Sequence, residues 1–310
     1  MPARFMTLTE LLESVRRVEV RTNRLVNDMM VGAYLSHFKG RGMDFEELRE
    51  YIPGDEVRDI DWNVTYRMGR PFVKRYREER ELAMVLAVDV SASSAFGSGP
   101  RSKREFAAEI GATLALSATR SSDKVALLLF SDQVELYLPP RKGRKHILRL
   151  IRELLAFQPA RPATSIPAAL AFLNHVLHRR SIIFLLTDFL HSFGPAAGQA
   201  MAGRDTLQEL GLTNARHDLV CVHLHDPRES RLPHAGLLTL EDAETGELLE
   251  MDTHRAAVRD AFARTNAERL AELDRALRRA GVETLSFSTV EPFAPTLQNF
   301  FETRRGRRRG

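Results

Sequence analysis

Short apolar runs alternate with longer segments of helical periodicity from about residue 84 to the end of the chain. Continuous apolar runs of this length are typical of strands that are buried on both faces of a sheet. The predicted strands are Met84–Val88, Lys124–Ser131, Ser181–Thr187, Asp218–His225 and Val282–Ser288. A short turn after the second of these leads into Gln133–Leu138, which we expect to pair with it as a hairpin.

Amphipathic segments separate most of these strands. The predicted helices are Ser102–Arg120, Gly143–Phe157, Ile166–His178, His254–Ala280 and Pro292–Glu302, and Leu237–Asp252 predicts a further hairpin. Crossover helices between strands predict an α/β fold with a doubly wound, mainly parallel sheet and one antiparallel edge strand. Ligand sites in such sheets lie at the carboxyl ends of the strands, so candidate chemistry is sought there.

The first part of the chain has no clean period. Leu8–Val18 predicts a helix, and the stretch from residue 38 to residue 81 is rich in charges and turn residues. We expect residues 1–80 to form an appendage packed on a main domain of residues 81–303. Trp62, the one tryptophan, is expected to anchor a core.

Composition places the chain among globular proteins. Of its 310 residues, 44% are hydrophobic and 28% are charged. No apolar run approaches the roughly 20 residues that cross a bilayer, and the N-terminus has no signal-peptide core. We therefore expect a cytoplasmic protein without membrane insertion. Cys221 is the single cysteine, which excludes an internal disulfide and a cysteine-rich metal site.

Positive charge is concentrated at the C-terminus. The formal net charge is +4, and residues 304–310 hold five arginines, so the rest of the chain carries 4 − 5 = −1. We expect residues 304–310 to be a disordered, solvated basic tail. Salt-dependent contact of this tail with nucleic acid is the alternative interpretation.

Side chains with hard oxygen atoms follow two of the predicted strands. Asp89, Ser91 and Ser93 alternate directly after the first strand, Asp188 ends the third, and Thr164 precedes a helix between them. If the sheet winds as predicted, these side chains converge at one edge. Oxygen ligands of this kind suit Mg²⁺ or Mn²⁺ and are poor for zinc. The sequence therefore predicts a metal site at this edge.

Each of these residues also has a simpler structural interpretation. Ser93 or Ser94 can cap the helix that follows, and Thr164 can cap the helix that begins at Ile166. An aspartate at a strand end is common in any α/β protein. The combination, in this order along the chain, is what favours the metal site.

Two patterns resemble known families. The order Asp-x-Ser-x-Ser, then Thr, then Asp is similar to the metal-ion-dependent adhesion site of von Willebrand factor type A domains. Gly40–Phe45, Leu48–Tyr51, Gly54–Trp62 and Lys74–Glu79 resemble the signature of a bacterial family, domain-of-unknown-function family fifty-eight. Members of that family commonly accompany MoxR-type AAA+ ATPases. The resemblance covers roughly residue 32 to the last helix.

The resemblance implies a role for each site residue. Ser91 and Ser93 would coordinate the ion directly, and Thr164 would do so in an open, partner-bound state. Asp89 and Asp188 would hold the ion directly or through waters. The function implied is a non-enzymatic, metal-dependent binding module that acts with a MoxR-type AAA+ ATPase in assembly or maturation of an unknown client protein.

One loop departs from the family pattern. The loop that holds the threonine is usually glycine-rich, whereas this chain has Arg161–Ser165 with a proline and an alanine. Proline restricts the backbone there. Ser165 is therefore an alternative ligand to Thr164.

A phosphohydrolase is the competing class of function. Asp89, at a strand end, has the position of an aspartyl nucleophile aided by Mg²⁺. Against this interpretation, Ser91 stands where such enzymes usually carry a second acid, and the sequence has no glycine-rich phosphate loop. We therefore expect no catalytic turnover.

Overall fold

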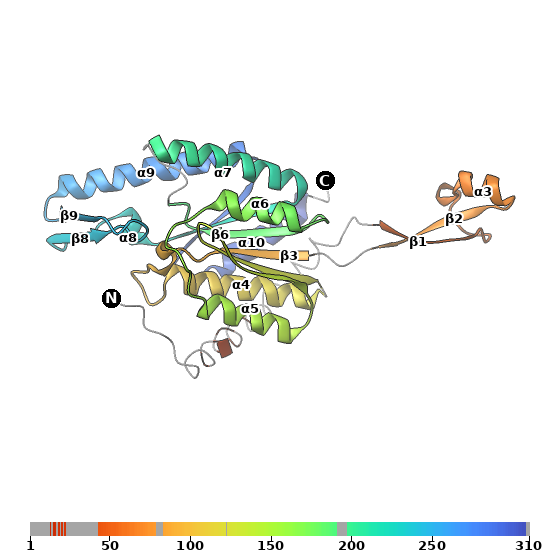
Figure 1. Cartoon of the computed structure of the whole chain (residues 1–310), viewed down its shortest axis with the longest axis horizontal. Helices are drawn as coiled ribbons and strands as arrows, with labels where there is room; N and C mark the ends of the chain where they lie inside the picture. Colours follow the sequence, from red (N-terminus) through yellow and green to blue (C-terminus); the bar gives the residue numbers. More distant parts are fainter. Residues whose placement is uncertain are drawn as a thin grey trace. The chain divides into compact units, whose positions relative to one another are not determined.

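The computed structural model of the chain describes residues 43–78, 83–121, 123–190 and 197–307, with six single positions between residues 13 and 22. The chain divides into two compact units (Figure 1). The smaller unit is Phe38–Leu82, and the larger unit is Met1–His37 together with Ala83–Gly310. Most of the helix predicted over Leu8–Val18, and residues 308–310 of the predicted tail, lie outside the described residues.

A six-stranded sheet forms the centre of the larger unit, in the order β10-β7-β6-β3-β4-β5. The strands are β3 (Ala83–Asp89), β4 (Lys124–Phe130), β5 (Val134–Arg141), β6 (Ile182–Thr187), β7 (Asp218–His225) and β10 (Glu283–Ser288). Five strands are parallel, and β5 pairs antiparallel with β4 at the edge. This confirms the predicted α/β fold with a mainly parallel sheet and one antiparallel edge strand.

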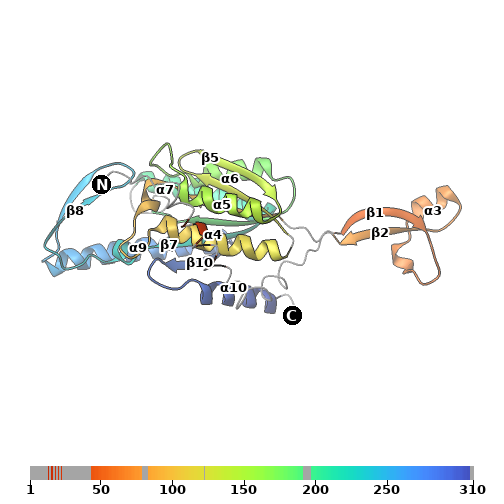
Figure 2. The same cartoon turned by 90° about the horizontal axis from the view of Figure 1, so that it is seen from below.

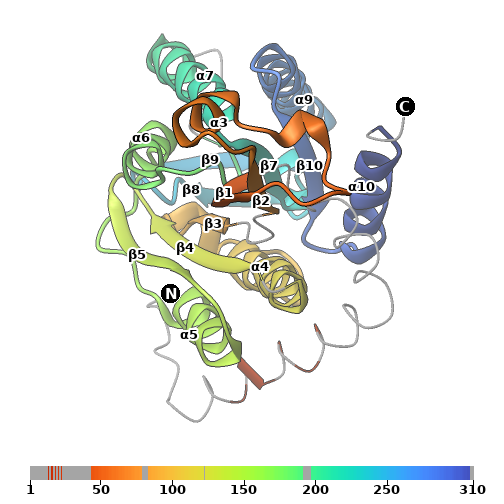
Figure 3. The same cartoon turned by 90° about the vertical axis from the view of Figure 1, so that its right-hand side faces the viewer.

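Helices cover both faces of this sheet. They are α4 (Lys103–Arg120), α5 (Arg144–Ala156), α6 (Ile166–Val176), α7 (Ala197–Arg216), α8 (Pro227–Ser230), α9 (Ala256–Arg279) and α10 (Ala294–Arg307), with a 3-10 helix, η3, over Ala92–Ala95. Helices α6, α7 and α9 lie on one face, and α4, α5 and α10 lie on the other (Figure 3). Because both faces are covered, every residue of β6 is buried.

Each covered face has its own packed core. On one face, apolar side chains of β3 and β6 pack with those of α6, α7 and α9. On the other, the ring of Phe106 in α4 makes edge contacts with Phe287 and Phe293, at centroid distances of 6.5 and 5.7 Å. The parallel register pairs Val88 with Leu186, so β3 and β6 end side by side. This register places the residues that follow the two strands at one edge.

Helix α7 was not among the predicted elements. Its sequence, AGQAMAGRDTLQELGLTNAR, contains three glycines and has no clear apolar stripe. Glycine lowers helix propensity by about 1 kcal/mol relative to alanine, so local sequence argues weakly for this helix. Its packing against α6 and β7, including buried Leu210, stabilises it instead.

Disorder was expected from residue 304, but helix α10 continues through Arg307. The guanidinium of Arg304 pairs with Asp218 at 2.6 Å and also with Glu283. These two carboxylates lie at the start of β7 and β10, so the pairs attach the end of α10 to the sheet. Arg304 is therefore engaged within the fold, which weakens the nucleic-acid interpretation of the tail.

The smaller unit is a hairpin with two short helices. It comprises β1 (Met43–Glu50), η2 (Val57–Asp59), α3 (Trp62–Met68) and β2 (Phe72–Glu78). Arg49 pairs with Asp55 through two hydrogen bonds of 2.8 and 2.6 Å. Asp61 accepts from the first turn of α3 and pairs with Lys74 at 2.9 Å. The charged signature residues thus hold this unit together.

Trp62 does not anchor a core, contrary to expectation. Its side chain is 65% exposed, and Tyr66, one helical turn further on, is 90% exposed. A unit of this size buries only a small part of its surface, so even large aromatic side chains can remain exposed in it.

Strand β6 offers a direct test of the fold. Replacing Leu185, which is fully buried in the core, by alanine should lower the free energy of unfolding by about 2–5 kcal/mol because a cavity remains. Urea denaturation followed by circular dichroism measures the change. Leu248→Ala, at a side chain that is 68% exposed, is the control and should cost far less. Equal losses in the two variants would contradict the assigned core.

Candidate metal centre

The loop after β3 brings three predicted site residues together. The backbone N–H of Ser91 donates to Asp89 Oδ1 at 2.9 Å, and the hydroxyl of Thr187 donates to Asp89 Oδ2 at 2.6 Å. The hydroxyl oxygens of Ser91 and Ser93 lie 3.1 Å apart. All four side chains are buried. Asp89 and the two serines therefore form one compact set of oxygen atoms.

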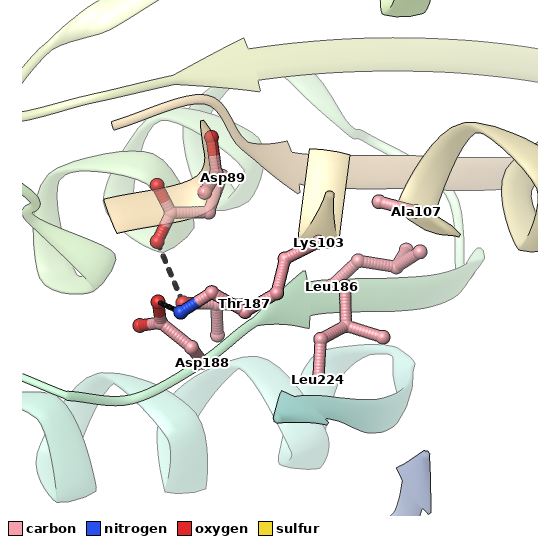
Figure 4. A pocket seen from close by; sticks show the side chains of 8 residues that line it. Asp89, Lys103, Ala107, Leu186, Thr187, Asp188 and Leu224 are labelled. Carbon is pink, nitrogen blue, oxygen red and sulfur yellow. Dashed lines mark hydrogen bonds and ion pairs between the residues drawn. The ribbon is translucent and has the colours of Figure 1, made fainter. Parts of the chain in front are cut away.

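Asp188 joins this set from the end of β6 (Figure 4). Its Oδ1 accepts from the backbone N–H of Leu190 at 3.1 Å, and its carboxylate also accepts from the side chain of Ser93. Asp188 lies near enough to Asp89 for the two negative charges to repel. Four of the five predicted residues thus lie together at the carboxyl edge of the sheet.

The pKa values of the Asp89 and Asp188 carboxyl groups are shifted in opposite directions. Burial, followed by repulsion from Asp188, raises the pKa of Asp89 from its ordinary value of 3.8 to about 6. Burial would also raise the pKa of Asp188, but the ammonium of Lys103 outweighs it and holds that pKa below the ordinary value. Asp89 makes no ion pair with any residue that the structure describes. The charge of Arg104 acts on Asp89 without forming an ion pair with it.

Lys103 is the site residue that sequence reasoning missed. Its side chain is 1% exposed, and its ammonium pairs with Asp188 at 2.5 Å and with Glu229 of α8. Burial disfavours the charged ammonium, yet the two carboxylates raise its pKa above the ordinary value. One signal was available: a lysine at the first position of helix α4 opposes the helix dipole, which indicates negative charge nearby.

Thr164 lies in a loop joined to the same edge. The backbone N–H of Ala92 donates to the carbonyl of Pro162 at 2.9 Å, which fixes this loop beside the Asp89–Ser93 segment. The hydroxyl of Thr164 donates to Glu244 Oε1 at 2.8 Å. Ser165, the alternative ligand, instead caps helix α6 by accepting from the backbone of Ala168.

A small pocket opens between the two strand ends and α4. It is lined by Asp89, Ser94, Lys103, Ala107, Leu186, Thr187, Asp188 and Leu224. In Figure 4 the ammonium of Lys103 reaches Asp188, and Thr187 points to Asp89. Ser91 and Ser93 do not line this pocket, so it adjoins the set of oxygen atoms at Asp89 and Asp188, and its apolar end belongs to the core.

The donor set fits a hard divalent cation. Two carboxylates and two hydroxyls meet at one edge, and one of the carboxylates lacks a cationic partner among the described residues. Mg²⁺ and Mn²⁺ prefer such oxygen ligands and retain several waters. Over the same described residues, no group of three or more His, Cys, Asp or Glu side chains is placed to hold a metal. Any ion here therefore depends on the hydroxyls.

The sheet order and the loops at its carboxyl edge define the larger unit as a von Willebrand factor type A-like α/β domain. The chain belongs to the family described as "Protein of unknown function DUF58", which matches residues 47–272. The match includes most of the smaller unit and the whole candidate site. This confirms the family that the sequence motifs indicated.

Two mycobacterial proteins are similar over nearly the whole chain. Uncharacterized proteins of Mycobacterium tuberculosis and Mycobacterium bovis are each 30% identical over 299 residues, covering 96% of this chain and 90% of the relative. The similarity therefore extends through both units.

Several solved structures are similar to this chain at low identity. An aerotolerance-related membrane protein from Bacteroides fragilis is 13% identical, covers 73% of this chain and 99% of its own, and has a TM-score of 0.46. The SpRpn10 VWA domain is 11% identical, covers 71% and 95%, and has a TM-score of 0.37. An uncharacterized membrane-spanning protein from Vibrio fischeri is 16% identical, covers 72% and 98%, and has a TM-score of 0.25.

The cytoplasmic location expected from the sequence is contradicted. Two of these similar structures are described as a membrane protein and a membrane-spanning protein. Within the described residues, none of the helices combines the length and apolarity needed to cross a membrane.

The raised pKa of Asp89 predicts a pH dependence of stability. Its pKa is higher in the folded state than in the unfolded state, so between about pH 4 and pH 6 the folded state binds more protons. This residue's contribution therefore falls as pH rises through that window, by on the order of 2–3 kcal/mol, and is constant above it. Urea denaturation in EDTA from pH 4 to pH 7, compared between wild type and Asp89→Asn, isolates the effect. A difference between the two proteins that does not change with pH would refute it.

Proposed function

We propose that this chain is a metal-dependent protein-binding module. In this proposal Asp89, Ser91, Ser93, Thr164 and Asp188 hold Mg²⁺ or Mn²⁺, which bridges the module to a carboxylate on a partner protein. The observation that carries the proposal is the buried, unpaired charge of Asp89 beside two adjacent hydroxyls and a second carboxylate. The chemistry of these donors supports a hard cation.

Three carboxylates gather at the site, and cationic side chains of the chain already balance much of their charge. Lys103 pairs with Asp188 and Glu229, and the charges of Arg104 and Arg269 also act on this group. Because Lys103 already compensates part of the charge, we expect the metal affinity to be modest.

The residues of this chain bind and orient, and they transfer no atoms. The hydroxyls of Ser91 and Ser93 are neutral donors, so an ion held by them keeps electrophilic character toward an incoming carboxylate. Ser91, two residues after Asp89, stands where an aspartyl phosphatase usually carries a second acid, which argues against a nucleophilic role for Asp89. We therefore favour binding over phosphohydrolase activity.

The proposed companion is a MoxR-type AAA+ ATPase, with an unknown client protein as the object of assembly or maturation. Membership of the DUF58 family supports this part of the proposal. In this arrangement the module binds its partner through the ion, and ATP hydrolysis by the ATPase provides the energy for assembly or maturation of the client. The metal site itself needs no turnover.

Metal binding can be measured directly. Calorimetric titration of wild type with Mg²⁺ or Mn²⁺ should show one weak site, and Asp89→Ala should weaken it at least tenfold because a charged ligand is lost. Asp260→Ala, at an exposed aspartate of helix α9, is the matched control and should bind as wild type does. Equal binding by wild type and Asp89→Ala would rule out the site.

Partner binding should depend on the ion. Pull-down from native extract with wild-type protein and Mg²⁺ should retain a partner that is lost with EDTA and regained when Mg²⁺ is added back. Ser91→Ala/Ser93→Ala should lose the same partner, while circular dichroism shows that the fold is kept. A partner retained under both treatments would place the interaction on another surface. Phosphatase turnover abolished by Asp89→Asn would favour the enzyme instead.

A further inference from the structure

A hydrogen bond links the candidate metal centre to a hairpin far along the chain. The hairpin comprises β8 (Leu237–Glu241) and β9 (Leu248–Asp252), and it lies at one end of the larger unit (Figure 2). Glu244, in the turn between the two strands, accepts from the hydroxyl of Thr164 at 2.8 Å. The two residues are 80 positions apart in sequence. This contact lies outside the strand pairing of the sheet and of the hairpin.

The turn of the hairpin fixes the position of Glu244. Asp242 Oδ1 accepts from the backbone N–H groups of Glu244 and Thr245, each at 2.9 Å. Gly246 follows with a φ of +74°, a conformation that glycine adopts without strain. At the base, the hydroxyl of Thr253 donates to the carbonyl of Gly236 at 2.6 Å. Glu244 is therefore presented by an ordered turn, and it is half-buried while its neighbours are exposed.

The direction of this hydrogen bond matters for the chemistry of Thr164. A threonine hydroxyl has one proton and two lone pairs, and only a lone pair can bind a metal ion. Because the proton of Thr164 is donated to Glu244, the lone pairs are left for another partner. A carboxylate acceptor also increases the negative charge on the hydroxyl oxygen. Groups that orient a ligand in this way typically change metal affinity by about 10–100-fold.

We propose that Glu244 is a positioning residue of the metal centre, which holds the hydroxyl of Thr164 in the orientation that binds the ion. This inference rests on the proposed function, since it requires that an ion occupies the site. It assigns the hairpin a role, because the hairpin delivers a carboxylate acceptor and residues 161–165 include no acidic side chain. Metal binding and the position of the hairpin turn are consequently linked.

Manganese alone is the probe for this proposal. Calorimetry with the full chain should show that Glu244→Ala weakens Mn²⁺ binding about tenfold. Glu244→Gln should fall between wild type and Glu244→Ala, because the amide oxygen still accepts the hydrogen bond but carries no charge. Glu247→Ala removes the same charge from the same hairpin turn at an exposed side chain and is the matched control. It should change the affinity less than twofold.

A double-mutant cycle shows whether Glu244 acts through Thr164. In a Thr164→Val background, Glu244→Ala should have no more effect than Glu247→Ala, because the hydroxyl that Glu244 orients is absent. An undiminished tenfold loss in that background would mean that Glu244 acts through its charge alone and would overturn the proposal. Tighter Mn²⁺ binding by Glu244→Ala would also overturn it, since Glu244 would then be holding Thr164 away from the ion.

The outcomes separate this inference from the proposed function. If wild type binds Mn²⁺ and Glu244→Ala binds it equally well, the inference fails and the metal site stands. If wild type itself binds no Mn²⁺, the proposed function fails, and the inference fails with it. Hydrogen exchange gives a second readout: Mn²⁺ should slow exchange of the turn amides at residues 242–247 in wild type and not in Thr164→Val.

Discussion

Two buried carboxylates lie side by side where strands β3 and β6 end, and their mutual repulsion must be balanced for the fold to hold them there. The register of the two strands brings them close, since Val88 pairs with Leu186, Asp89 follows Val88 directly, and Asp188 comes two residues after Leu186. Lys103 balances Asp188 and Glu229, and hydrogen bonds from Ser91 and Thr187 satisfy the oxygens of Asp89. Burial, followed by repulsion from Asp188, raises the pKa of Asp89 and so disfavours its charged form. A bound cation would favour that charged form.

Much of the fold and part of the site could be predicted from the sequence. Buried parallel strands are recognised as continuous apolar runs. Because parallel strands end at one edge of the sheet, the sequence also predicts that Asp89, Ser91, Ser93 and Asp188 lie close together. Helix α7 escaped because its stability comes from packing and not from its glycine-containing sequence. The exposure of Trp62 could not be predicted, because an aromatic side chain is buried only where neighbouring residues cover it, and local sequence does not show this.

The missing parts of the site share one cause. Lys103 and Glu244 act on site residues 85 and 80 positions away, respectively, and no local pattern encodes such a contact. Local sequence did predict the hairpin and its turn, but the target of the Glu244 carboxylate depends on where the hairpin lies in the larger unit. The ends of the strands supply the carboxylates, and the loop after β3 supplies the hydroxyls of Ser91 and Ser93. Elements distant in sequence contact other residues of the site: Lys103 pairs with Asp188, and Glu244 accepts from Thr164. The proposed ion-dependent binding rests on this arrangement.

The most direct test of this account is anomalous diffraction from crystals of the full chain grown or soaked with Mn²⁺. The account predicts one anomalous peak at coordination distance from the hydroxyls of Ser91 and Ser93, between Asp89 and Asp188, with Lys103 still paired to Glu229. A peak elsewhere, or none at this edge under saturating Mn²⁺, would contradict it. In that case the chain's own cationic side chains would balance these carboxylates, and the binding function would have to reside on another surface.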